Sequence, residues 1–191
     1  MKQIVLASSS PRRKKLLESI GLDVRVIASN IDEKLNPRLK GVGQAESLSE
    51  QKAAAVLPDA EGYVVVGADT LVLLGDEMLG KPKTDKEAKR MLSKLSGRKH
   101  SVVTGYTIIS DSGRRRITSS VVTDVYFKVI SKSDIDSYIK KEKVMDKAGA
   151  YAIQGLGALF VERIEGDFFN VVGLPIFSVA KSLRKFGVEI L

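Results

Sequence analysis

The segment from Ser8 to Lys15 places three hydroxyls, a proline and four cations where a short apolar run ends. Ser10 is a favourable N-cap residue and Pro11 suits the first helical position, so a helix is predicted to begin here. The four cations have the wrong sign for a helix N-terminus, which favours negative charge by roughly 0.3–1 kcal/mol per group. A bound anion would relieve this repulsion, and phosphate fits best. The alternative is a basic surface helix whose side chains point to water.

Carboxylates occur at two other positions that could face this segment. Asp69 follows the apolar run Tyr63–Val66, and the pair Asp32-Glu33 follows another predicted strand. Ligands gather at the strand ends of α/β sheets, so Asp69 is a candidate metal ligand or general base, although it could equally cap a turn. Two or three carboxylates opposite a phosphate cradle form the arrangement that magnesium requires. Without that context, Asp32-Glu33 is interpreted as a solvated loop pair.

Four further residues give weak signals when each is taken alone. Lys52 lies on a predicted helix, where a lysine usually faces water, and Lys81 lies in a turn that glycine and proline make rigid. Gln154 lies in a loop of small residues that would let a ligand approach the backbone. His100 is the only histidine and lacks an obvious partner, so it is interpreted as a structural residue at the start of a strand.

The apolar pattern alternates between the strand and helix periods. Strands are predicted at Ile4–Ala7, Val24–Ala28, Tyr63–Val66, Leu71–Leu74, Val102–Ile109, Ile117–Val129, Leu159–Ile164 and Val188–Leu191. Helices are predicted at Pro11–Ile20, at Ala45–Leu57, from Thr84 to about Leu95, from Ser133 onward and after Pro175. Gly67 is interpreted as a strand break, and Asp111-Ser112-Gly113 as a hairpin turn. The pattern predicts an α/β fold with a mixed sheet, in a single domain spanning residues 1–191.

The composition excludes several classes of protein. The absence of cysteine excludes a disulfide scaffold and a thiol nucleophile. No apolar run is long enough to cross a bilayer and no signal peptide is recognisable, so we expect a cytoplasmic protein with no membrane partner. The 31 Lys and Arg against 23 Asp and Glu give a net charge of +8, which favours anionic partners, although it could also reflect a solvated basic surface. Few aromatic residues argue against a base-stacking nucleic-acid binder.

Several of these segments also carry a family resemblance. In chain order they are Ser8–Arg13, Gly67–Thr70, Leu79–Pro82, Leu95–His100, Thr104-Gly105, Asp146–Tyr151, Ile153–Gly155 and Asn170–Pro175. Together they resemble the Maf family of nucleoside triphosphate pyrophosphatases, over essentially the whole chain. Two departures are Ala152, where the family often has glycine, and Phe168, where tyrosine is frequent.

The resemblance implies an elongated, ITPase-like α/β fold with two lobes around a central cleft, usually as a homodimer. It implies cleavage of a nucleoside triphosphate to the monophosphate and pyrophosphate with a divalent metal ion such as Mg, Mn or Co. Asp69 would accept the proton, and Asp69 with Glu33 would hold the metal ion. The phosphate-binding residues would be Ser8, Arg12, Arg13, Lys52 and Lys81, and the specificity residues would be Arg12, Thr70 and Gln154.

The specificity residues resemble those of the family branch that acts on dTTP and UTP, with CTP or modified pyrimidine nucleotides as further candidate substrates. A sister branch that acts on 7-methyl-GTP carries tryptophan at the position of Arg12, and this chain has no tryptophan. The competing hypothesis is a non-catalytic regulator that binds nucleotides or nucleic acid. It predicts cations on one convex face and a dispensable Asp69.

Overall fold

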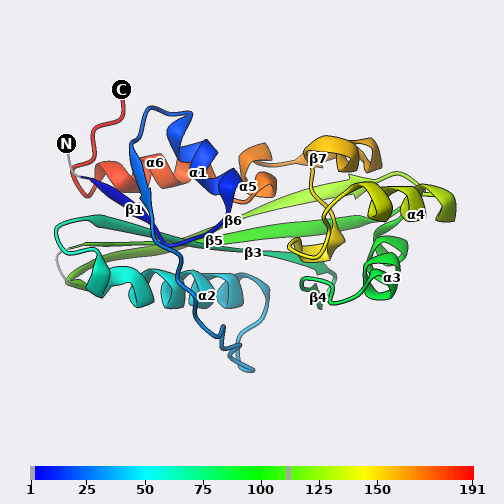
Figure 1. Ribbon diagram of the computed structural model, residues 1–191, viewed down its shortest axis with the longest axis horizontal. Helices are drawn as coiled ribbons and strands as arrows, with labels where there is room; N and C mark the ends of the chain where they lie inside the picture. The colour runs from blue at the N-terminus through cyan, green and yellow to red at the C-terminus, as the bar shows by residue number, and fades with distance from the viewer. Residues whose placement is uncertain (1–2, 111–112) are drawn as a thin grey trace.

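A mixed β-sheet runs the length of an elongated molecule in the computed structural model, which describes residues 3–110 and 113–191 (Figure 1). Its strands are β1 (Ile4–Leu6), β2 (Val24–Val26), β3 (Val64–Leu74), β4 (Glu77–Leu79), β5 (Lys99–Ser110), β6 (Arg115–Phe127) and β7 (Val161–Glu165). The strand order is β2-β1-β3-β5-β6-β7, and β4 pairs with β3 outside this path. Strand β1 is parallel to β2 and β3, and the other pairs are antiparallel. The predicted mixed sheet is therefore confirmed.

Helices cover both faces of this sheet. They are α1 (Pro11–Glu18), α2 (Gly41–Val56), α3 (Asp85–Leu95), α4 (Lys132–Lys141), α5 (Phe168–Val172) and α6 (Ile176–Arg184), with short 3-10 turns at Leu57–Asp59, Ala148–Ala150 and Gly155–Phe160. Helices α1, α5 and α6 lie over one face, α2 lies over the opposite face, and α3 and α4 lie at the far end (Figure 1). Within the described ranges, no helix combines the length and the apolar character needed to span a membrane.

The alternating side chains of β3 divide the core. Val64 and Val66 belong to a cluster with α1 and α6, whereas Val72, further along the same face, belongs to a second cluster with α3 and α4. Val65 and Leu71 point to the opposite face and pack in the clusters beneath α2. The side chains of β3 therefore contribute to two hydrophobic clusters on one face of the sheet and to two more on the face beneath α2.

Two glycines bring α2 directly onto the sheet. A Cβ atom on Gly67 would lie 2.4 Å from the carbonyl oxygen of Ser49, and one on Gly105 would lie 2.3 Å from that of Ala45. Only glycine permits this approach of helix backbone to strand backbone. The prediction that Gly67 breaks the strand is wrong, because β3 continues through it. Asp69 therefore lies inside a strand and not at the end of one.

Three other features differ from the predictions. Val188–Leu191 forms no strand, because its alternating apolar residues pack against the core without pairing to a neighbour. Strand β4 and helix α5 were not predicted, and each is only three to five residues long. Of the predicted hairpin turn, Asp111 and Ser112 lie outside the described residues.

We expect Gly67→Ala to lower the free energy of unfolding by about 1–3 kcal/mol, because the added methyl group would force α2 away from β3. The matched control is Gly80→Ala, since a Cβ atom there would meet nothing within 4 Å. Urea denaturation of both variants measures the difference. A Gly67→Ala protein as stable as the control would contradict the close approach.

Candidate active site

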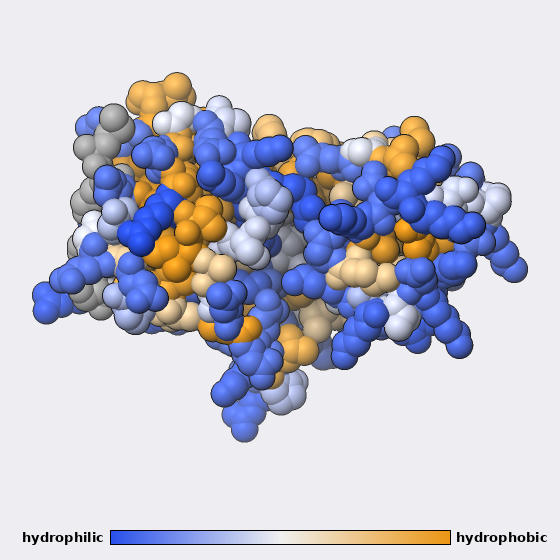
Figure 2. Space-filling model, viewed as in Figure 1, coloured by the Kyte–Doolittle hydropathy of each residue, from blue (hydrophilic) through white to orange (hydrophobic). Residues whose placement is uncertain are grey.

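A cavity opens where one edge of β3 lacks a neighbouring strand. On this edge β1 pairs with residues 64–66 and β4 with residues 72–74, and no described strand pairs with the interval between them. The cavity beside this interval has a volume of about 370 Å³. Figure 2 shows the surface hollowed near its middle, between the half that carries α1 and α6 and the half that carries α3 and α4. The expected central cleft between two lobes is confirmed.

The structure brings all of the candidate site residues together, although they come from separate segments of the chain. The cavity is lined by Ser8, Arg12, Arg13, Glu33, Lys52, Asp69, Thr70, Lys81 and Gln154, among other residues. Asp32 does not line the cavity and is exposed to solvent. The interpretation as a solvated loop residue is therefore correct for Asp32 but not for Glu33, which lines the cavity.

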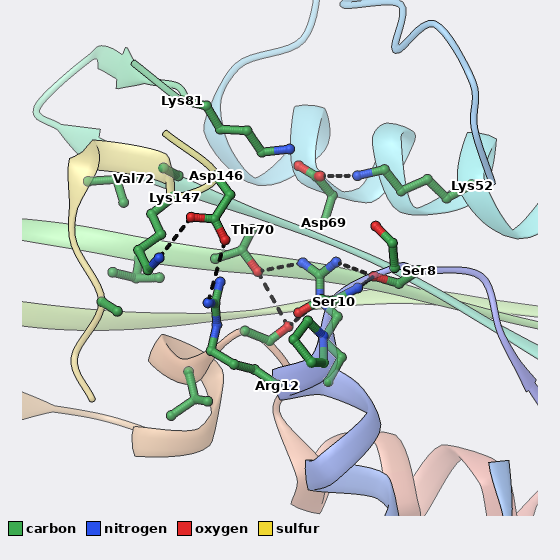
Figure 3. A pocket seen from close by; sticks show the side chains of 18 of the residues that line it. Ser8, Ser10, Arg12, Lys52, Asp69, Thr70, Val72, Lys81, Asp146 and Lys147 are labelled. Atoms are coloured by element: carbon green, nitrogen blue, oxygen red, sulfur yellow. Dashed lines mark hydrogen bonds and ion pairs between the residues drawn. The ribbon is translucent and has the colours of Figure 1, made fainter. Parts of the chain in front are cut away.

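One wall of the cavity holds two carboxylates on a single ammonium group. Asp69 points toward α2, and Lys52 Nζ donates a hydrogen bond to Asp69 Oδ1 (Figure 3). The same Nζ lies 2.9 Å from Glu33 Oε1. The side chains of Lys52 and Asp69 are only 9% and 10% exposed. Burial of charge at this depth requires pairing, and the shared ammonium supplies it.

Glu33 remains ionised because of its cationic neighbours. Burial by itself would raise the pKa of Glu33, but the hydrogen bond and charge of Lys52 outweigh it and hold the pKa below its ordinary value. The positive charges of Lys81 and Arg13 act in the same direction. Glu33 is therefore a carboxylate at neutral pH.

Gln51, which the sequence analysis missed, holds the loop that carries Glu33. Its Oε1 accepts from the Lys34 N–H at 3.1 Å, and its Nε2 donates to the Lys34 carbonyl oxygen at 3.0 Å. Both partners of this contact are sequence neighbours of the ion pair, since Gln51 precedes Lys52 and Lys34 follows Glu33. A lone polar residue on a helix gives no sequence signal for such a role.

Arg13 ties the opposite wall together. Its Nε donates to the Gly173 carbonyl oxygen at 2.8 Å, its Nη1 to Ser8 Oγ at 3.1 Å and its Nη2 to Thr70 Oγ1 at 3.0 Å. Burial lowers the pKa of Arg13, opposed in part by the charge of Asp69. Three donors are used within the protein, so Arg13 is a structural link between α1, β3 and the turn after α5 as well as a source of positive charge.

The start of α1 matches its prediction, with one difference. Ser10 is the N-cap residue and Pro11 begins the helix, but the Ser10 hydroxyl makes no capping hydrogen bond. The Ser10 N–H instead donates to Ser8 Oγ at 3.2 Å. The first turn also contains no acidic residue, so the positive charge of this helix start, whose residues line the cavity, is not offset by a side chain of the turn itself.

Arg12, Lys81 and the loop of Gln154 also line the cavity. Arg12 Nη1 lies 3.9 Å from Asp146 Oδ2, and Lys147 Nζ donates to Asp146 Oδ1 at 2.7 Å (Figure 3). The ammonium group of Lys81 points toward Asp69 in the same view. Asp146 and Lys147 belong to the segment Asp146–Tyr151, whose residue types alone did not indicate a role for either side chain.

His100 supports the Gln154 loop from inside the core. It is 2% exposed, does not line the cavity, and its Nε2 lies 2.8 Å from the Tyr151 hydroxyl. Nearby, the Tyr138 hydroxyl accepts from the Ala152 N–H at 3.2 Å. The structural interpretation of His100 is confirmed.

The donor set for a metal ion is small. The described residues contain no group of three or more His, Cys, Asp or Glu side chains placed to hold one. Asp69 and Glu33 nevertheless converge on one cationic group beside an open, cation-rich cavity. Magnesium commonly takes one or two protein carboxylates and completes its shell with water and phosphate oxygens, so this pair fits such an ion.

The chain resembles known proteins over nearly its full length. A family model described as "Maf-like protein" matches residues 3–186. A curated protein of Desulforamulus reducens named dTTP/UTP pyrophosphatase is 47% identical over 190 residues, which cover 100% of both chains. A protein of Bacillus velezensis with the same name is 46% identical over 188 residues, covering 98% of both. The solved Staphylococcus aureus Ham1 protein shares the fold, with a TM-score of 0.53 at 15% identity, covering 98% of this chain and 100% of that one.

Arg13 and Lys81 are expected to respond differently to removal. Arg13→Ala deletes three hydrogen bonds from a charged donor and should lower the free energy of unfolding by about 3 kcal/mol. Lys81 is exposed, so Lys81→Ala should change stability by less than about 0.5 kcal/mol while weakening the binding of tripolyphosphate roughly tenfold or more. Urea denaturation and calorimetric titration measure the two effects. Equal stability losses would contradict the structural role of Arg13.

Burial lowers the pKa of His100 to about 4 from its ordinary 6.5. The unfolded chain therefore takes up a proton between these values while the folded chain does not, so stability is complete above pH 6.5 and falls as the pH approaches 4. The loss from this group is up to about 3 kcal/mol. Denaturation at pH 7.5 and 4.5 should show a smaller pH dependence for His100→Gln than for the unaltered protein; an equal dependence would contradict the assignment.

Proposed function

The chain belongs to the Maf family, and we propose from this premise that it hydrolyses dTTP and UTP to the nucleoside monophosphate and pyrophosphate. The observation that carries the proposal is the cavity, in which a carboxylate pair on one wall faces a cationic helix start on the other. Curated relatives that match the full length and are named dTTP/UTP pyrophosphatase support the choice of substrate.

The cationic wall suits a triphosphate. Ser8 and Arg12 lie on the α1 side of the cavity, and Lys81 lies on the side of Asp69 (Figure 3). Phosphoryl transfer depends mainly on positioning and on stabilising negative oxygens, which these groups provide. Arg13 retains two N–H groups beyond its three internal bonds, and they can also face phosphate oxygens.

Asp69 is the proposed proton acceptor. Its ion pair with Lys52 fixes the carboxylate at the cavity wall, where it can take the proton of an attacking water. The family resemblance directs this attack to the α-phosphorus: a bond forms from the water oxygen, the bond to the bridging oxygen breaks, and pyrophosphate leaves. Lys52 thus acts first on Asp69, whereas the family resemblance places it among the phosphate-binding residues.

A divalent ion would be held by Asp69 and Glu33. When bound, such an ion (Mg, Mn or Co) would polarise the phosphoryl oxygens and lower the pKa of a coordinated water. Glu33 is suited to this role because its carboxylate remains ionised at neutral pH.

Substrate choice is assigned to Arg12, Thr70 and Gln154. The Gln154 amide can both donate and accept, which matches the mixed edge of thymine or uracil. A methylated, positively charged guanine would favour an aromatic face for cation–π contact, and the positive charge of Arg12 would instead repel it. The homodimer and the cytoplasmic location implied by the resemblance and composition stay predictions.

We expect Asp69→Asn to lower kcat/KM for dTTP and UTP by about 10²–10⁴, because the amide keeps the shape of the side chain but cannot accept the proton. Pyrophosphate release would be measured with magnesium and a nucleotide panel of dTTP, UTP, CTP, GTP and 7-methyl-GTP. Unchanged turnover by the variant would contradict the role of Asp69. A preference of the unaltered protein for 7-methyl-GTP would contradict the substrate assignment, and binding without cleavage of any nucleotide would favour a regulator.

A further inference from the structure

A line of hydrogen-bonding groups runs from the cavity into the core through Thr70. Thr70 is half-buried at the cavity wall, and its Oγ1 lies 2.9 Å from Thr104 Oγ1. Thr104 Oγ1 in turn lies 3.0 Å from the main-chain carbonyl oxygen of Asn170. Thr104 and Asn170 are completely buried and do not line the cavity. They can reach a ligand only through Thr70.

The two ends of this line fix the direction of every proton in it. The Asn170 carbonyl oxygen can only accept, so Thr104 donates to it and must accept from Thr70. At the other end Arg13 can only donate, so Thr70 Oγ1 accepts from Nη2 at 3.0 Å. The one proton of the Thr70 hydroxyl is therefore directed inward. The Gly173 carbonyl oxygen, at 3.4 Å, is a second and longer acceptor within the protein, so in either case the Thr70 proton is held by a protein group.

The inner end is held firmly. Asn170 Nδ2 donates to the Val102 carbonyl oxygen at 3.0 Å and to Thr123 Oγ1 at 2.9 Å. The Asp167 carboxylate caps the same short helix by accepting from the Phe169 and Asn170 N–H groups. The Asn170 carbonyl is therefore a fixed acceptor, and Thr104 cannot easily reverse its hydroxyl.

We propose that this relay makes Thr70 a hydrogen-bond acceptor, and not a donor, toward the substrate. The substrate group on Thr70 is then a donor, and the donor that thymine and uracil share is the imide N–H of the ring. Cytosine has an unprotonated ring nitrogen at that position. This nitrogen and Thr70 Oγ1 would both be hydrogen-bond acceptors, so no hydrogen bond could form between them. Thr104 is accordingly a positioning residue for base selection. The inference rests on the proposed function, because it names the base contact of the same site.

Thr104→Val, with Thr104→Ser as its matched control, tests the relay. Valine has a similar shape but removes the Thr104 acceptor and leaves only the Gly173 carbonyl oxygen at 3.4 Å, a long contact, so the Thr70 proton can turn toward the cavity, whereas serine keeps the hydroxyl. We expect the ratio of kcat/KM for UTP to that for CTP to fall roughly tenfold in Thr104→Val and to be retained in Thr104→Ser. A purely structural role would lower both rates together, and an unchanged ratio in Thr104→Val would overturn the proposal.

Two further substrates separate the base from the sugar, whose hydroxyls are also donors. UTP methylated at the ring imide nitrogen lacks the imide donor, and 3′-deoxy-UTP lacks one sugar hydroxyl. If Thr70 accepts from the base, Thr104→Val should change the ratio of kcat/KM for UTP to that for the methylated nucleotide. The ratio of kcat/KM for UTP to that for 3′-deoxy-UTP should stay the same. The reverse result would overturn the imide assignment.

The proposed function and the relay can fail separately. Calorimetric binding of UMP and CMP to the intact protein and to both variants reports on Thr70 without turnover. If the unaltered protein fails to hydrolyse dTTP and UTP but binds UMP more tightly than CMP, with the difference lost only in Thr104→Val, the hydrolytic function fails and the relay stands. Equal binding of UMP and CMP by the unaltered protein would overturn the relay.

Discussion

The close packing of α2 on the sheet is the contact on which the rest of the site depends. At Gly67 and Gly105 the helix backbone lies against strand backbone, with no side chain between them. This approach carries Lys52 to Asp69 and carries Gln51 to the loop of Glu33. A helix held further from the sheet would weaken the ion pair between Lys52 and the buried carboxylate of Asp69, and a buried charge without its partner is costly.

The open interval on the edge of β3 gives this chemistry access to solvent. Because β1 ends before the interval and β4 begins after it, the middle of a long, otherwise buried strand borders a cavity. The pleat then divides the two functions. Asp69 faces α2 and its lysine, while Thr70, the next residue, faces Arg13 and the hydroxyl relay. Each side chain is held by a different layer of the protein.

The sequence was sufficient for the fold class, most of the longer elements and the set of residues that meet in the cavity. Local signals such as the Ser10-Pro11 helix start and the apolar periods are strong because they depend only on neighbouring residues. The roles of Gly67, Gln51 and Thr104 depend on contacts between distant segments, and their residue types are common elsewhere. Gly67 in particular has the same appearance in a sequence whether it ends a strand or admits a helix.

The consecutive placement of Asp69 and Thr70 has an evolutionary consequence. Because neighbouring residues on a strand face opposite layers, a substitution at Thr70 or behind it alters the proposed base contact while leaving the α2 side of the strand in place. A duplicated gene could therefore acquire a new nucleotide preference through changes on one layer alone, while inheriting the proposed proton acceptor Asp69 and its ion pair with Lys52 intact. The alternation of side chains along β3 thus allows the residues around Thr70 to change in evolution while those around Asp69 stay the same.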